Sequence, residues 1–125
     1  MNSSIYVDPK IDLNSEESIE VIIQFKTNPA KVQIALSDAG LTLDQAMQNV
    51  EESHKRFEAE LIRISNEHLI SFDILNRYKE VYNGVAMRIQ GVNIKYLLQS
   101  SEMKAIHLNS QMSIPIQPND PRYQI

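Results

Sequence analysis

The first periodic pattern in the chain is the segment Ile19–Phe25, whose sequence IEVIIQF is rich in β-branched residues and nearly alternates. This pattern is typical of a strand that is buried at its centre. The next apolar segment, residues 30–39, is short and is closed by Gly40, which predicts a short helix with glycine just beyond its end. Residues 1–17 are polar and aperiodic, so they are predicted to be a flexible lead-in of low order.

A longer helix is predicted to begin after Thr42. Gln45 follows three residues later, and this spacing is that of a capping box, in which two side chains satisfy backbone N–H groups of the first turn. Asp44 places a negative charge where the helix dipole favours one. An apolar stripe at spacings of three and four residues then extends over about six turns. The stripe consists of Leu43, Ala46, Met47, Val50, His54, Phe57, Leu61 and Ile64. We interpret the charged residues beside it as a solvated face rather than a site.

The next pattern predicts a hairpin. Residues 69–82 read as a strand, and the strongest part of the pattern is residues 74–82. Asn83 and Gly84 follow, and this pair predicts a two-residue type I′ turn, because both central residues of that turn need a positive φ. Val85–Ile89 is then the return strand.

The remaining periodic segments predict a helix over residues 92–100 and a last strand over Met103–Leu108. The predicted order is strand, helix, strand, strand, helix, strand, which is the split βαβ or ferredoxin-like arrangement. We therefore predict an α+β, ferredoxin-like βαββαβ domain at residues 18–110, with a four-stranded antiparallel sheet and two helices on one face. The other face of the sheet would be open, which makes it a natural docking surface.

The sequence changes character after Ile114. Three prolines, Pro115, Pro118 and Pro121, lie within seven positions in a segment without amphipathic period. Proline fixes its own φ, removes a backbone donor and biases the preceding residue toward extended geometry. Residues 111–125 are therefore predicted to be an extended tail that leaves the folded domain.

Composition excludes several classes of function. The chain has 125 residues, a net charge of −4 and no basic patch, so we expect no nucleic-acid partner. It has no apolar run of transmembrane length, so we expect no membrane partner, and it has no cysteine for disulfide or thiolate chemistry. Motifs for nucleotide or cofactor binding are missing, and His54, His68 and His107 are not at metal-ligand spacing. We therefore expect no metal, no cofactor and no catalytic residue, and we interpret His54 as a core residue.

Residues Tyr78–Asn109 resemble the second half of the propeptides of subtilisin-like serine proteases. The shared features are a strand that runs into Asn-Gly, a return strand with small residues, a helix with paired leucines and a final edge strand. Ile19–Gln33 resembles the opening strand and the following helix of that family, so the resemblance covers about residues 18–110. The segment Pro118–Ile125, PNDPRYQI, is similar to the first residues of mature thermitase-like proteases.

The resemblance implies an intramolecular chaperone and product-like inhibitor of a cognate protease domain, and not an enzyme. In this family the sheet face docks on two parallel helices of the protease, and the segment after the last strand lies in the substrate cleft. The residues implied to bind the cleft are Asn109, Ser110, Gln111, Met112, Ser113, Ile114, Pro115 and Ile116. The resemblance places the cleavage point within Met112–Ile116 and the mature-like N-terminus after it, both inside the tail 111–125.

The chain also departs from the family. Acidic residues that follow the last strand in well-known members, and that cap the protease helices, are here replaced by His107, Leu108 and Asn109. Asp120 matches a calcium ligand of mature proteases, so calcium is implied only with the protease domain present. The resemblance further implies a secreted, bacterial-type protein that is monomeric when isolated, although the first residues show no signal peptide. Two alternatives stay open: a free-standing inhibitor of the same fold and an unrelated ferredoxin-like interaction module.

Overall fold

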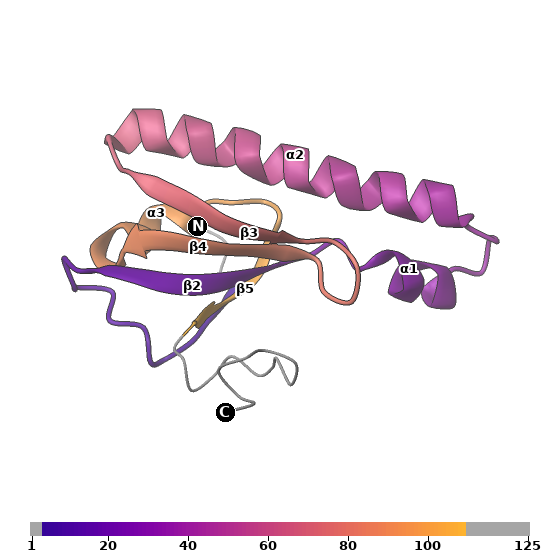
Figure 1. Cartoon of the computed structure of the whole chain (residues 1–125), viewed down its shortest axis with the longest axis horizontal. Coiled ribbons are helices and arrows are strands. Elements are labelled where there is room, and N and C mark those ends of the chain that lie inside the picture. The colour runs from indigo at the N-terminus through magenta and orange to yellow at the C-terminus, as the bar shows by residue number, and fades with distance from the viewer. Residues whose placement is uncertain (1–3, 110–125) are drawn as a thin grey trace, which may run out of the picture.

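Five strands and three α-helices make up residues 4–109, the part of the chain that the computed structural model describes (Figure 1). The strands are β1 (Tyr6–Val7), β2 (Ser18–Phe25), β3 (Phe72–Tyr78), β4 (Gly84–Gln90) and β5 (Met103–Leu108). The helices are α1 (Ala30–Leu36), α2 (Leu43–His68) and α3 (Ile94–Leu97), with a 3₁₀ turn, η1 (Gly91–Asn93), before α3. The domain is therefore of the α+β class, as predicted.

The strands form one sheet in the order β1-β5-β2-β4-β3. The four strands β2 to β5 pair antiparallel with their neighbours, whereas β1 pairs parallel to β5. The sheet is thus five-stranded and mixed, and the prediction of a four-stranded antiparallel sheet is wrong in that respect. The final strand is also not an edge strand, because β1 lies along its outer side.

The extra strand comes from the segment that was predicted to be a flexible lead-in. Tyr6 and Val7 lie opposite Ala105 and Ile106, and Ile11 is buried with only 7% of its surface exposed. A two-residue strand has no alternation to detect, so its pairing could not be read from residues 4–17. The segment is part of the sheet because main-chain bonds and one buried isoleucine hold it there.

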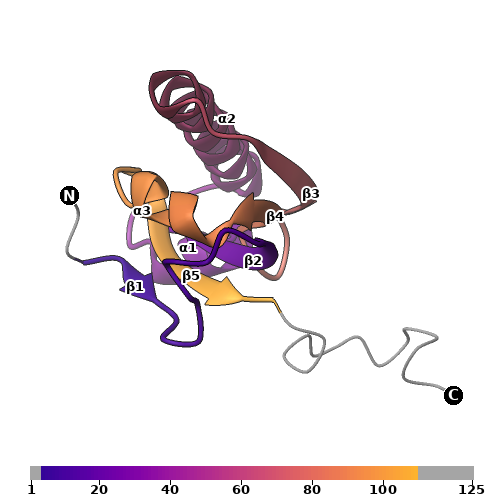
Figure 2. The ribbon, with the colours of Figure 1, turned by 90° about the vertical axis from the view of Figure 1, so that its left-hand side faces the viewer.

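The core lies between the sheet and the helices α2 and α3. Val21, Ile23 and Phe25 alternate on the helix side of β2 and are almost fully buried. Phe57 and Leu61 of α2 are equally buried within the same cluster. Figure 2 shows α2 and α3 on the same side of the sheet, and no described helix covers the opposite side.

The capping box of α2 is confirmed. The Thr42 hydroxyl accepts the Gln45 N–H at 3.1 Å, and the Gln45 side chain accepts the Thr42 N–H at 3.0 Å. Ala46 and the stripe residues from Val50 onward are buried, but Leu43 and Met47 are 53% and 52% exposed. Figure 1 shows the reason, because the first turns of α2 extend past the end of the sheet toward α1.

The predicted type I′ turn is wrong. β3 ends at Tyr78 and a loop of residues 79–83 joins it to β4, while neither Asn83 nor Gly84 has a positive φ. Asn83 is only 2% exposed, so its amide serves inside the protein rather than at a turn tip. Gly84 is instead needed for close packing, since a Cβ there would lie 1.9 Å from the backbone oxygen of Ile23.

Both short helices end earlier than predicted. α1 ends at Leu36, four residues before Gly40, which has a φ of 73° within the linker to α2. The helix predicted over residues 92–100 is one turn of α-helix after η1, and Ile94 is among its fully buried residues. Within residues 4–109, no helix is long and apolar enough to cross a membrane.

Candidate functional site

The sheet face opposite α2 and α3 is the first candidate site, and we call it the open face (Figure 2). Successive residues of a strand point to opposite sides, so the residues between the buried core positions of each strand lie on this face. Cross-strand pairing brings them into rows. The central residues of the open face are Glu20, Ile22, Asp73, Ala86, Arg88, Ala105 and His107.

One row of the open face is charged. Arg88 lies opposite both Glu20 and Asp73, and its guanidinium is 3.2 Å from the Glu20 carboxylate and 4.0 Å from the Asp73 carboxylate. All three side chains are substantially exposed, so these pairs contribute little to stability. The row is therefore available to meet charges on a partner.

The neighbouring row is apolar and shallow. Ile22 lies between Ala86 and His107 in the register, and Ala105 follows one step further along β5. Ala86 and Ala105 are only 3% and 6% exposed. Their side chains are short, so a partner's helix could approach the backbone of the sheet closely at these two positions.

Of the residues predicted to bind the cleft, Asn109 alone lies within the described residues 4–109. Asn109 follows directly after β5, and its N–H donates to the backbone oxygen of Glu20 at 2.8 Å. The other predicted cleft-binding residues, Ser110 to Ile116, lie outside the described residues, as does Asp120. His107 lies on the open face, and the centroid of its ring is 5.3 Å from that of the Tyr6 ring.

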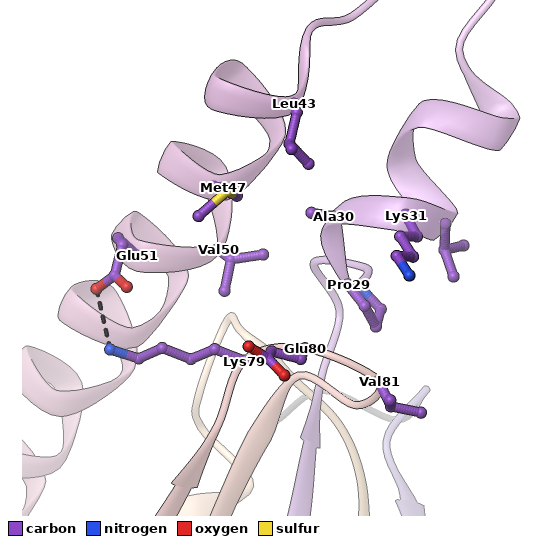
Figure 3. Close-up of a pocket in the computed structure, with 11 residues that line it drawn as sticks. Pro29, Ala30, Lys31, Leu43, Met47, Val50, Glu51, Lys79, Glu80 and Val81 are labelled. Carbon is purple, nitrogen blue, oxygen red and sulfur yellow. Dashed lines mark hydrogen bonds and ion pairs between the residues drawn. The ribbon is translucent and has the colours of Figure 1, made fainter.

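A groove of about 660 Å³ is the second candidate (Figure 3). It lies between α1, the first half of α2 and the β3–β4 loop. Leu43, Met47 and Val50 give it an apolar wall, and Lys79 crosses its mouth to reach Glu51, with 3.0 Å between the ammonium and the carboxylate. The sequence pattern placed Leu43 and Met47 on the apolar stripe and therefore did not predict the groove. The only feature of the sequence that could have indicated their exposure is their position in the first turns of the helix.

A buried polar cluster lies beside this groove. His54 Nε2 is 2.9 Å from Asn83 Oδ1 and 3.1 Å from the Tyr78 backbone oxygen, and since both are acceptors, Nε2 carries the proton. Asn83 in turn donates to the Thr27 backbone oxygen at 2.9 Å and to the Ser53 hydroxyl at 3.0 Å. His54 is 3% exposed, which confirms its interpretation as a core residue.

His68 and Tyr82, two further titratable rings among the described residues, also have structural partners. His68 stacks on Tyr96 at 4.0 Å between ring centroids. Tyr82 packs edge-on to Tyr78, and burial, together with the neighbouring Tyr78, raises the pKa of Tyr82 to about 12, so its phenol stays protonated at neutral pH. Among residues 4–109, no group of three histidine, aspartate or glutamate side chains is placed to hold a metal ion.

A comparison of the sequence with protein-family profiles finds no match, and neither does a comparison with curated proteins. Three features of the chain therefore indicate its function: the geometry of the open face, the position of Asn109 after β5 and the resemblance in the sequence.

Proposed function

We propose that this chain is the propeptide of a secreted subtilisin-like serine protease, which it helps to fold and then inhibits. We propose further that its fold is ferredoxin-like, with β1 added beside β5. The order β5-β2-β4-β3 supports this assignment, because it becomes 4-1-3-2 when these strands are numbered along the chain, as expected for two interlocked βαβ units. The resemblance of residues 18–110 and of PNDPRYQI supports the protein class.

The observation that carries the proposal is the shallow apolar row of the open face. Ala86 and Ala105 allow close approach of a partner's helices, and Ile22, which lies opposite Ala86, offers apolar surface to bury. This is the surface that a propeptide needs if it is to template two parallel helices of the protease. No described helix of the chain itself covers it.

Glu20 can replace the acidic residues that the sequence lacks after the last strand. It lies on the neighbouring strand beside Asn109, whose N–H its backbone oxygen accepts at 2.8 Å. Its carboxylate is 44% exposed and is paired with Arg88 in the charged row. In the proposed complex this carboxylate meets the N-terminus of a protease helix, where a negative charge is favourable.

The segment after Asn109 supplies inhibition in this proposal. An extended segment can pair with edge strands of a substrate cleft through main-chain hydrogen bonds, while alternate side chains fill its subsites. The chain itself acts as an inhibitor and not as a catalyst, and its processed end lies in the cleft as a product would.

Inhibition of the protease tests the proposal. The purified chain would be titrated against the mature protease domain that the proposal places next in the same reading frame, and we expect stoichiometric inhibition. Alanine replacement of residues 111–116 should weaken inhibition while the far-UV circular dichroism stays the same. A folded chain that leaves the protease active at micromolar concentration contradicts the proposal. A reading frame without a protease domain would favour a free-standing inhibitor instead.

A further inference from the structure

Asp8 lies beside the end of β5, although it is distant from that strand in sequence. Its N–H donates to the Ile106 backbone oxygen at 2.9 Å, which continues the pairing of β1. Its Oδ2 accepts the Leu108 N–H at 3.0 Å, and its Oδ1 accepts the Lys10 N–H at 3.0 Å. Asp8 is only 9% exposed, and both of its side-chain hydrogen bonds are partly buried.

The opposite side of β5 is held by β2. The N–H of Asn109 donates to the Glu20 backbone oxygen at 2.8 Å. Successive N–H groups of a strand point to opposite sides, so the last two described amides are held from two directions. Asp8 holds Leu108 and β2 holds Asn109. Together they fix the positions of the last two described residues.

The segment that carries Asp8 is itself anchored. Ile11 is 7% exposed within the core cluster, and its N–H donates to the Asp8 backbone oxygen at 3.0 Å. Val7 packs against the same cluster. Hydrogen bonds from the N–H groups of Lys10 and Leu108 hold the pKa of Asp8 below its ordinary value. The acceptor is thus ionised at neutral pH, and hydrogen bonds to ionised acceptors are the stronger ones.

We propose that residues 5–11 form a clasp, and that Asp8 is a positioning residue that aims the C-terminal segment from β5 toward the protease cleft. This inference rests on the proposed function. A product-like segment inhibits well only if the body holds it in place, because ordering a free segment costs conformational entropy at the moment of binding. Without Asp8 the end of β5 can separate from β1. The C-terminal segment is then attached to a strand end that moves.

Two variants test the clasp. Asp8→Ala removes both side-chain acceptors, whereas Asp8→Asn keeps the size but places an amide donor against one of the two N–H groups. Asp12→Ala is the matched control, since it makes the same chemical change in the same segment. The Asp12 carboxylate is exposed and accepts only the local Asn14 N–H, at 2.9 Å.

The first measurement is amide hydrogen exchange in the free chain, followed by NMR. We expect the Leu108 amide to exchange about tenfold faster in both Asp8 variants, as loss of a charge-assisted hydrogen bond implies. Amides of β4 should be unchanged, and the Asp12 control should leave the Leu108 amide unchanged and alter exchange only near Asn14. In the unaltered chain, the Leu108 amide proton shift should also titrate with the Asp8 carboxylate, which tests the bond without any substitution. A Leu108 amide that neither titrates nor changes its exchange overturns the clasp.

The second measurement is the inhibition constant against the protease. Both Asp8 variants should inhibit about tenfold more weakly than the unaltered chain, and Asp12→Ala should inhibit equally well. Faster exchange at Leu108 with unchanged inhibition would overturn the positioning role. An unaltered chain that does not inhibit at all would contradict the proposed function instead, and the exchange data would still decide whether the clasp exists.

Discussion

Asn83 joins four segments of the chain through one side chain and its own backbone. Its amide bonds the segment after β2 at Thr27 and the helix α2 at Ser53 and His54. Its backbone oxygen accepts the N–H of Phe25 at 2.9 Å. An asparagine suits this position because its side chain offers both donors and an acceptor in one plane.

Replacing Asn83 should therefore be costly. Asn83→Ala leaves the Thr27 oxygen without this donor and His54 without its shorter bond, and buried polar groups that lose a partner cost about 1–3 kcal/mol each. We expect the variant to lose about 2–4 kcal/mol of unfolding free energy, measured by urea denaturation. Asn76→Ala is the control, because Asn76 is exposed and bonds only the N–H of Arg77. Equal midpoints for the two variants would contradict this account.

Glu20 gives a second prediction at the scale of single residues. If its carboxylate meets a helix N-terminus of the protease, Glu20→Gln should weaken inhibition about threefold to tenfold. Asp73→Asn removes the same charge from the far end of the charged row and should change inhibition little. The comparison of the two inhibition constants at low salt decides the matter. Equal effects of the two substitutions on the inhibition constant would show that inhibition depends on the net charge of the chain and not on the position of Glu20.

At the scale of elements, side chains of α2 hold the turn that precedes β5. The Glu60 carboxylate accepts the Ser100 hydroxyl at 2.6 Å and the Ser101 N–H at 3.0 Å. One turn earlier on α2, Arg56 bonds the buried Glu102 at 2.9 Å. A helix and a strand that are distant in sequence are thereby held in register by two carboxylates.

The Glu60 contact predicts a dependence of stability on pH. Burial raises the pKa of Glu60, but hydrogen bonds from Ser100 and Ser101 outweigh it and leave the pKa below its ordinary value of 4.5. The folded state therefore favours the ionised carboxylate. The contribution of the Glu60 carboxylate to the free energy of unfolding is fully present above about pH 4.5. It is lost as the pH falls through the lower pKa that Glu60 has in the folded state.

Measuring the free energy of unfolding by urea denaturation at several pH values tests this contribution of Glu60. Glu60→Gln should be less stable than the unaltered chain at pH 7, and its stability should fall less steeply below about pH 4.5. Glu52→Gln serves as the control on the same helix, since Glu52 is exposed and contacts only Gln48 at 3.3 Å. Parallel stability curves for Glu60→Gln and the unaltered chain would refute the role of this carboxylate.

Elements with their own periodicity could be predicted from the sequence, and elements that depend on distant partners could not. The last strand has the predicted bounds, Met103–Leu108, and α2 begins directly after the predicted capping residue, Thr42. β1 could not be predicted, because two residues carry no pattern and their partner is at the other end of the domain. Asn83 was assigned to a turn because its local preference favours one, but buried partners in α2 and in the segment after β2 outweigh that preference.

The same distinction applies to the candidate sites. The open face follows from strand alternation, so residues such as Ile22 and Arg88 could be placed on it once the strands were known. The groove could not be predicted, because it exists only where α2 extends past the sheet and leaves Met47 uncovered. The distance by which a helix extends past its sheet depends on packing and not on local sequence.

At the scale of the whole molecule, a single core joins the sheet to its helices. Phe25, Phe57, Met87 and Ile106 come from four different elements and are all buried in one cluster. We therefore expect the isolated chain to fold without a protease and to unfold in one cooperative transition. Far-UV circular dichroism during thermal unfolding would show this. A random-coil spectrum at room temperature would contradict it.

The pairing of β1 with β5 has a consequence for how the domain is completed. Asp8 and Leu108 are 100 positions apart, so their bond closes a loop that contains nearly every other element. Closing so long a loop is entropically costly, and contacts of large sequence separation slow folding. β1 is synthesised before β5 and must wait for that strand before the two can pair. The contact between β1 and β5 therefore forms late in folding. A partner that binds only when this contact is present distinguishes a completely folded domain from an incomplete one.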